Sequence, residues 1–227
     1  MKLILASSGF ESKEAVKKCV ELVGKPAKKV NFAIINEAYA VEHGDHHWIL
    51  DDIDSIRKNF GGNIEFVNLL ALSIDKIEES INASDVIFVI GGNTEYLKTV
   101  FDKTGFSKLL PKLLKDKVYI GSSAGSMILG RQPSYKTQDK IYGKVDYFGV
   151  HEYLNILKFS ILPHLHSKYF SERADIWAIK ESENVDYPVY AISDHAAVIV
   201  DGNQEYVVGH DYIKLLSGKE IDINSGK

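Results

Sequence analysis

The chain has 227 residues, of which 45% are hydrophobic and 26% are charged, and its formal net charge is −4. This length and hydrophobic content predict one domain, residues 1–227, with a full core. The net charge speaks against a nucleic-acid-binding protein, whose surface would be basic. The apolar runs are shorter than the about 20 residues of a membrane-spanning helix. The first of them, residues 3–6, is also too short for a signal peptide.

The single cysteine, Cys19, precludes an internal disulfide and favours a reducing cytoplasm. It shares a helical spacing with Ala15, Val16, Val20 and Val23. A cysteine in such an apolar stripe is expected to pack as a small hydrophobic residue rather than to act as a nucleophile.

Short apolar runs alternate with amphipathic segments along the first half of the chain. Strands are predicted at residues 2–6, 30–35, 63–69, 85–90 and 118–120, with helices between them at about 13–23, 48–59, 74–81, 95–101 and 106–114. This alternation predicts an α/β fold, with a doubly wound, largely parallel sheet flanked by helices. Later strands are predicted at 158–162 and 189–192, and a C-terminal hairpin at 196–200 and 206–208. A functional site in such a sheet lies at the carboxyl ends of the strands.

The segment from Lys117 to Gly130, KVYIGSSAGSMILG, contains the pattern G-x-S-x-G between an apolar strand and a helix. That context is typical of a nucleophile elbow, in which a tight turn holds the central serine, here Ser123, clear of the sheet. Backbone N–H groups at the start of the helix could then stabilise an oxyanion. The alternative is a glycine-rich turn without chemistry.

A serine nucleophile needs a base, and histidine is the usual one. His164 directly follows the predicted strand at 158–162, which places it at a strand carboxyl end. His43, His46 and His47 crowd one loop, but no metal-binding spacing accompanies them, so a solvated loop is the preferred interpretation.

The acid that would orient the histidine is expected between the serine and the histidine. Asp139 and Asp146 both lie there, and the residues alone do not separate them. Either acid gives the chain order Ser, Asp, His.

Three stretches in this order resemble the dipeptidase E and cyanophycinase group of serine peptidases. They are residues 90–94 (IGGNT), 120–125 (IGSSAG) and 162–164 (LPH). The fold of that group is similar to that of class I glutamine amidotransferases. Those enzymes carry a cysteine at the elbow, where this chain has Ser123, and a carboxylate two residues after the histidine, where it has His166.

The resemblance implies a role for each matching residue. Ser123 would be the nucleophile, His164 the base and Asp139 the acid of the triad. The backbone N–H groups of Gly92 and Ala124 would form the oxyanion hole.

Two further residues are expected to bind substrate. Asn93 belongs to the glycine loop, and Arg173 lies downstream of the base, where an arginine of the family recognises an acidic substrate. A surface ion pair of Arg173 with Glu172 or Asp175 is the alternative.

The expected function is therefore a cytoplasmic serine hydrolase that cleaves small peptides, as an exopeptidase or dipeptidase, through an acyl-enzyme on Ser123. No metal and no organic cofactor is expected. The expected partner is a small peptide substrate, with no nucleic acid and no membrane; monomer and homodimer both stay open. Two alternatives remain: a non-catalytic α/β binding or sensor protein, and a serine hydrolase that acts on a non-peptide amide or ester.

Overall fold

A computed structural model describes residues 1–134, 137 and 152–222 of the chain. Its centre is a seven-stranded sheet with the order β3-β2-β4-β5-β1-β8-β9. Five neighbouring strands of this sheet pair in parallel. They are β1 (Lys2–Ala6), β2 (Phe32–Ile35), β3 (Ile64–Phe66), β4 (Val86–Val89) and β5 (Val118–Ser122). The hairpin of β8 (Ala196–Asp201) and β9 (Gln204–Gly209) continues the sheet in antiparallel pairing. The predicted α/β class is confirmed.

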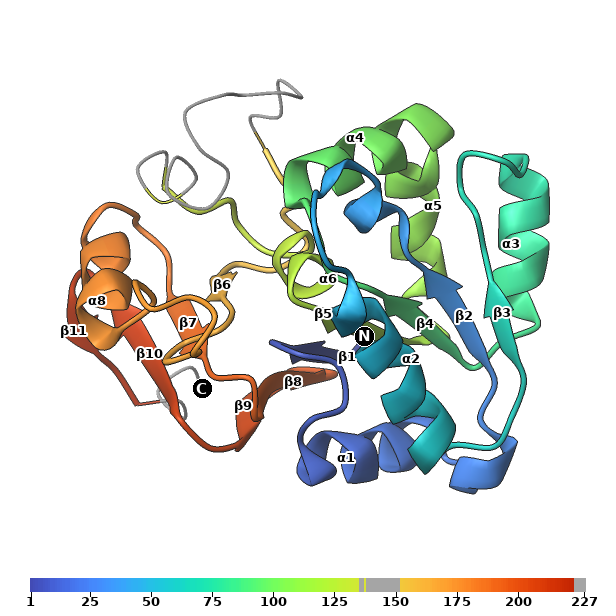
Figure 1. Cartoon of the computed structure of the whole chain (residues 1–227), viewed down its shortest axis with the longest axis horizontal. Coiled ribbons are helices and arrows are strands. Elements are labelled where there is room, and N and C mark those ends of the chain that lie inside the picture. Colours follow the sequence, from blue (N-terminus) through green and yellow to red (C-terminus); the bar gives the residue numbers. More distant parts are fainter. Residues whose placement is uncertain (135–136, 138–151, 223–227) are drawn as a thin grey trace.

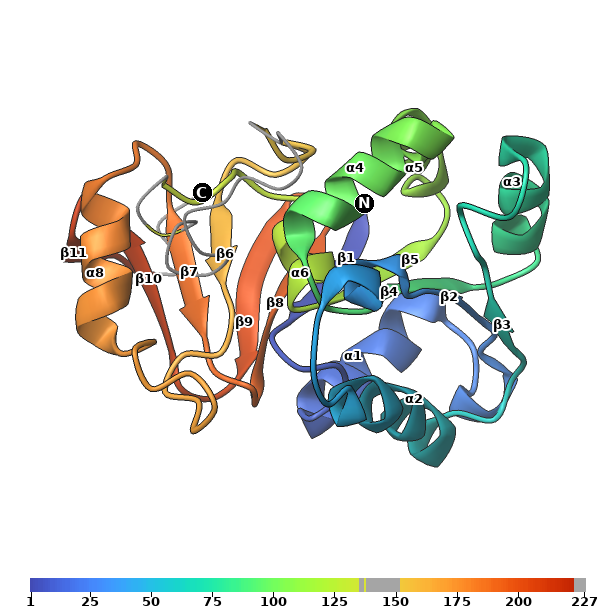
Figure 2. The same cartoon turned by 45° about the horizontal axis from the view of Figure 1, so that its top comes forward.

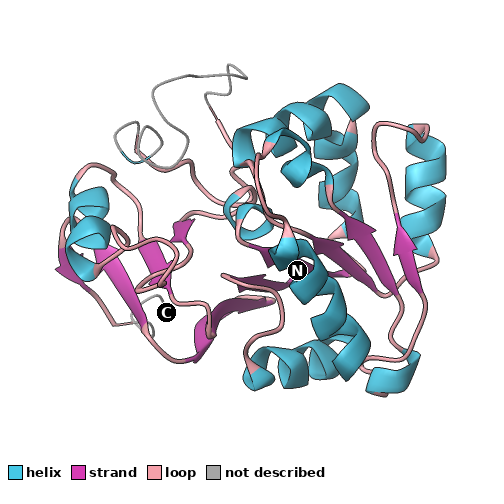
Figure 3. Ribbon diagram, viewed as in Figure 1, coloured by secondary structure: helices cyan, strands magenta, loops and turns pink. Residues whose placement is uncertain are grey.

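Helices cover both faces of this sheet (Figures 1 and 3). One face carries α1 (Lys13–Val23) and α2 (His47–Asn59). The other carries α3 (Ile74–Asn82), α4 (Thr94–Thr104), α5 (Phe106–Leu113) and the short α6 (Ala124–Met127). The 3₁₀ turns η1 (Ala27–Lys29) and η2 (Glu37–Val41) lie on either side of β2 in the chain.

The alternation of side chains along each strand divides the core between the two faces. In β1, Leu3 and Leu5 pack into the cluster under α3 to α6, whereas Ile4 and Ala6 pack into the cluster under α1 and α2. Cys19 of α1 is fully buried in the second cluster. Burial raises the pKa of its thiol to about 12, so Cys19 packs as the sequence predicts.

A second, four-stranded sheet with the order β11-β10-β7-β6 lies beside the β8–β9 end of the first (Figure 2). Its strands are β6 (Ser160–Leu162), β7 (Val189–Ile192), β10 (Tyr212–Leu216) and β11 (Lys219–Glu220), and α8 (Asp175–Glu183) packs against it. The sequence predicted β6 and β7 but not their separate sheet. Both strands are buried along their whole length, as inner strands of one large sheet would also be.

The predicted strand at 63–69 is shorter in the structure, since β3 ends at Phe66. The side chain of Asn68 accepts hydrogen bonds from the backbone N–H groups of Leu70 and Ala71, and this turn ends the strand. Val67 and Leu69 remain buried, which explains the strand-like apolar pattern. Across the described ranges, none of the helices combines the length and the apolar character that a bilayer crossing requires.

Candidate active site

Ser123 stands on the turn between β5 and α6 with backbone angles φ 49° and ψ −109°. A positive φ is rare for a residue with a side chain, and it marks the strained turn of a nucleophile elbow. Two glycines allow the turn. A Cβ atom on Gly121 would lie 2.4 Å from the carbonyl carbon of Gly125, and one on Gly125 would lie 2.1 Å from the carbonyl oxygen of Val89. The predicted strand, turn and helix are therefore present.

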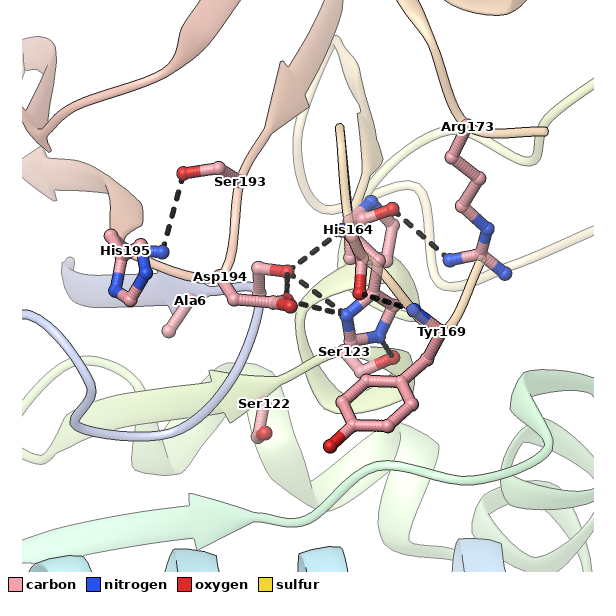
Figure 4. A network of polar contacts seen from close by, with 12 residues as sticks. Ala6, Ser122, Ser123, His164, Tyr169, Arg173, Ser193, Asp194 and His195 are labelled. Carbon is pink, nitrogen blue, oxygen red and sulfur yellow. Dashed lines mark hydrogen bonds and ion pairs between the residues drawn. The ribbon is translucent and has the colours of Figure 1, made fainter. Parts of the chain in front are cut away.

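His164 follows β6 and reaches Ser123 from the second sheet. Its Nε2 atom lies 2.9 Å from the Oγ atom of Ser123 (Figure 4). The backbone of His164 also has a positive φ, 66°, so its conformation requires support from neighbouring groups. The structure thus brings together the serine and the histidine that the sequence analysis selected.

The carboxylate that binds the other side of the imidazole is Asp194, in the turn between β7 and β8. Its Oδ1 atom lies 2.6 Å from the Nδ1 atom of His164. The sequence analysis placed this acid at Asp139 or Asp146, and both lie outside the described residues. The position beside Nδ1 is held by Asp194 instead.

One sequence signal could have found this acid. His164 stands two residues after β6 and Asp194 two residues after β7. Because β6 and β7 pair in parallel, their carboxyl ends meet at the same edge of the second sheet.

Ser7, at the end of β1, connects the histidine to the acid. The backbone N–H of His164 donates to the Ser7 Oγ atom at 2.7 Å, and the Ser7 hydroxyl donates to Oδ1 of Asp194 at 2.8 Å. Ser7 is fully buried, so water does not compete for these bonds. The sequence analysis missed Ser7, because nothing in the SSG turn distinguishes it from an ordinary strand end.

The surroundings of the pair favour a neutral imidazole beside an ionised acid. Burial lowers the pKa of His164, and the charge of Asp194 only partly opposes this. Burial alone would raise the pKa of Asp194, but the contact with His164 and the hydroxyls of Ser7 and Ser167 lower it to about 2. A neutral histidine with an ionised partner is the state that a general base requires.

The glycine loop after β4 lies next to the serine, because β4 and β5 are parallel neighbours. A Cβ atom on Gly91 would lie 3.1 Å from the Cβ atom of Ser123. Gly92 has φ 127°, and a Cβ atom there would lie 2.4 Å from the carbonyl oxygen of Ala38 in η2. Within the described residues, neither the N–H of Gly92 nor that of Ala124 has an acceptor.

Asn93 has a structural task. It is the N-cap of α4, and its side chain accepts a hydrogen bond from the backbone N–H of Tyr96 at 3.0 Å. Its role in substrate binding stays a prediction.

Arg173 is 6% exposed, and its Nη1 atom donates to the carbonyl oxygen of Pro163 at 3.0 Å. Asp175, its predicted ion-pair alternative, lies 2.9 Å from Nε2 of His166. A role of Arg173 in recognising a substrate carboxylate also stays a prediction.

The three histidines of the loop at 43–47 do not share a common set of contacts in the described structure. His47 lies 2.5 Å from Asp45, and the ring of His46 packs edge-on against Tyr39 and Trp48. Throughout the described part of the chain, no group of three or more potential ligand side chains is arranged to hold a metal ion.

Fold and site together define an α/β protein in which a serine on a strained turn, a histidine and an aspartate form a continuous series of hydrogen bonds. The chain belongs to peptidase family S51, whose model matches residues 3–208. This is the family of dipeptidase E and cyanophycinase, so the resemblance seen in the sequence is confirmed.

Similar proteins agree with this assignment. The chain is 30% identical to an uncharacterized peptidase of Listeria monocytogenes, Lmo0363, over 65% of this chain and 71% of that protein. It is 26% identical to an uncharacterized peptidase of Pasteurella multocida, PM1590, over 70% and 77% of the two chains.

Two solved structures share the fold. A Listeria monocytogenes protein described as a candidate peptidase E has a TM-score of 0.75 and 24% identity, covering 92% of this chain and 98% of its own. A peptidase from an acI-B1 Actinobacterium has a TM-score of 0.68 and 20% identity, covering 97% and 96%.

Proposed function

We propose that this peptidase is of the serine type and cleaves small peptides, as an exopeptidase or dipeptidase. The observation that carries the proposal is the series of hydrogen bonds from Ser123 through His164 to Asp194. Its two links measure 2.9 and 2.6 Å, and it starts at a serine held with positive φ. A serine hydroxyl in this arrangement is activated for attack on a carbonyl carbon.

In the proposed reaction, Nε2 of His164 takes the proton of the Ser123 hydroxyl as Oγ attacks the scissile carbonyl. Asp194 holds the Nδ1–H tautomer and stabilises the imidazolium that forms. The N–H groups of Gly92 and Ala124 bind the oxyanion. His164 then protonates the leaving amine, and a water molecule, activated by the same histidine, hydrolyses the acyl-enzyme.

The substrate class follows from the family rather than from a bound ligand. Membership of family S51 supports a small peptide substrate, and aspartyl dipeptides are the first candidates because of the resemblance to dipeptidase E. Action in the cytoplasm is part of the proposal, supported by the single, buried cysteine.

Labelling with an uncharged fluorophosphonate tests the serine mechanism without knowledge of the substrate. The probe reacts only with an activated serine, so we expect one phosphonyl group per chain, located by mass spectrometry on Ser123. A dipeptide library then tests the substrate class. A protein that is not labelled would be a binding or sensor protein, and a labelled protein that cleaves no peptide would act on another amide or ester.

Ser7→Ala is expected to slow fluorophosphonate labelling about tenfold. The substitution removes the acceptor of the His164 N–H and one donor to Asp194, so the imidazole loses part of its support. Ser160→Ala is the matched control. It removes a buried hydroxyl from β6, and within the described residues that hydroxyl has no hydrogen-bond partner. Equal labelling rates for Ser7→Ala and Ser160→Ala would show that Ser7 does not help to position His164.

A further inference from the structure

The segment from His164 to Arg173 forms a closed loop that carries the base. Three successive turns build it: the N–H of Ser167 donates to the carbonyl of His164, that of Phe170 to Ser167, and that of Arg173 to Phe170, at 2.9 to 3.1 Å. The N–H of His166 donates to the carbonyl of Arg173 at 2.8 Å and closes the loop. The two ends of the loop are therefore fixed against each other, and Arg173 lies at the closing point.

The guanidinium of Arg173 contacts this loop at two places next to the base. Its Nη1 donates to the carbonyl oxygen of Pro163, which belongs to the peptide bond that leads into His164. Its central carbon also lies 4.1 Å from the ring centroid of Phe170. That ring is stacked on the imidazole of His164, with a centroid distance of 4.8 Å and an interplanar angle of 28°. One side chain thus supports both the backbone and the ring of the base.

The Arg173 side chain makes these contacts in a buried environment, where water competes little for them. Arg173 is 6% exposed, and a second aromatic ring, that of Trp177 in α8, lies 5.7 Å from the guanidinium. A planar guanidinium stacks on aromatic faces while it donates in its own plane, which the ammonium group of lysine does not do. In Figure 4 the guanidinium lies beside the loop backbone, where the dashed line joins it to the carbonyl oxygen.

We infer that Arg173 is a positioning residue for His164, holding the loop and the Phe170 ring against the imidazole so that its Nε2 meets Ser123. The inference rests on the proposed serine mechanism and names the task of one further residue in it. It differs from the sequence-based expectation, in which the guanidinium of Arg173 pairs with a carboxylate of the substrate.

The charge of Arg173 acts on the same histidine. Among the residues that the structure describes, two charged groups affect the protonation of the imidazole besides its burial: Asp194 in the β7–β8 turn raises the pKa of His164, and Arg173 in its own loop lowers it. Loss of the positive charge therefore raises this pKa. Because the base must be neutral to act, the acid limb of the pH profile would then move to higher pH.

The test measures the second-order rate constant for labelling of Ser123 by an uncharged fluorophosphonate between pH 4 and 9, on folded protein. Arg173→Met removes the charge and the contacts of the guanidinium with Pro163 and Phe170, whereas Arg173→Lys keeps the charge and loses the planar contacts. Arg131→Met is the matched control, because Arg131 lies over the ring of Tyr187 at 5.6 Å. It removes an arginine–aromatic contact on another segment of the chain.

We expect labelling of Arg173→Met to fall about tenfold or more at its plateau, with its acid limb displaced to higher pH. Arg173→Lys should be labelled more slowly than the wild type, but the acid limb of its pH profile should stay at the wild-type pH. Arg131→Met should match the wild type in both the labelling rate and the pH profile. Wild-type rates and profiles in both Arg173 variants would overturn the inference. So would a loss that disappears when the rate is divided by the folded fraction.

Hydrolysis of an acidic dipeptide and of its analogue with amides in place of both carboxylates gives a second readout. A positioning residue predicts the same relative loss for both substrates, whereas a loss confined to the acidic dipeptide would assign Arg173 to substrate binding and overturn the inference. Failure of the wild type to react with the probe would instead reject the proposed serine mechanism, so the two failures are distinguishable.

Discussion

Ser123→Ala is expected to abolish both fluorophosphonate labelling and peptide hydrolysis, with turnover reduced on the order of 10⁴ to 10⁶. The substitution removes the attacking oxygen and leaves the turn intact, because alanine and serine have the same backbone requirements at φ 49°. The N–H of residue 123 would still donate to the carbonyl of Ala6. Circular dichroism and the melting temperature should therefore stay close to those of the wild type.

Ser122→Ala is the control for this result, since it removes the neighbouring hydroxyl on the same turn. The Ser122 Oγ atom accepts a hydrogen bond from the N–H of Gly9 at 3.0 Å. It also contacts Asp52, whose pKa burial raises to about 7. Loss of this buried hydroxyl should cost stability, about 1 to 3 kcal/mol, and leave the label on Ser123. If Ser122→Ala were not labelled and Ser123→Ala were labelled, Ser122 and not Ser123 would be the nucleophile.

Asp194→Asn is expected to reduce turnover by about 10³ to 10⁴ while the protein stays folded. The amide is similar in shape to the carboxylate, but it carries no charge and can present its N–H₂ group to Nδ1. It then favours the tautomer of His164 that has the proton on Nε2, the atom that must accept it. Rates of labelling and of hydrolysis, each followed against pH, would measure the loss.

The pH profile of this variant has an expected direction as well. Asp194 raises the pKa of His164, so its removal lowers that pKa, and any residual activity should extend to lower pH. Asp139→Asn and Asp146→Asn are the controls, and both should remain close to the wild type. If Asp139→Asn or Asp146→Asn were inactive and Asp194→Asn were active, the acid of the triad would be the aspartate between Ser123 and His164.

Local sequence patterns predicted the first half of the fold well. The helix between Ser12 and Gly24 is an example, because the residues directly before and after it are typical capping residues. The Ser12 side chain accepts from the N–H of Ala15, and Gly24 has φ 71°. The elbow was equally readable, since the close approaches at Gly121 and Gly125 admit only glycine.

The acid was harder to read from the sequence, because its position depends on pairing between distant strands. Asp194 follows His164 in the chain, whereas the sequence analysis expects the acid between Ser123 and His164. Asp194 lies beside Nδ1 of His164 because β6 and β7 pair in parallel. The local sequence does not predict the second sheet in which these two strands lie.

The role of Arg173 was also not predictable from the sequence. A lone arginine downstream of the base has the same appearance in a sequence whether it faces the substrate or the interior. Its burial and its contact with the carbonyl of Pro163 depend on how the whole loop folds back.

The two sheets contribute different parts of the site, and this division has a consequence for how the protein loses activity. Ser123 and Ser7 directly follow strands of the large sheet, whereas His164 follows β6 of the small sheet and Asp194 lies in the turn from β7 of the small sheet to β8 of the large one. The hydrogen-bond series therefore exists only while the small sheet stays docked. Local opening of that part, at a cost below that of global unfolding, would inactivate the enzyme while most of its helices persist. Activity is in this sense a more sensitive reporter of sheet docking than any measure of helix content.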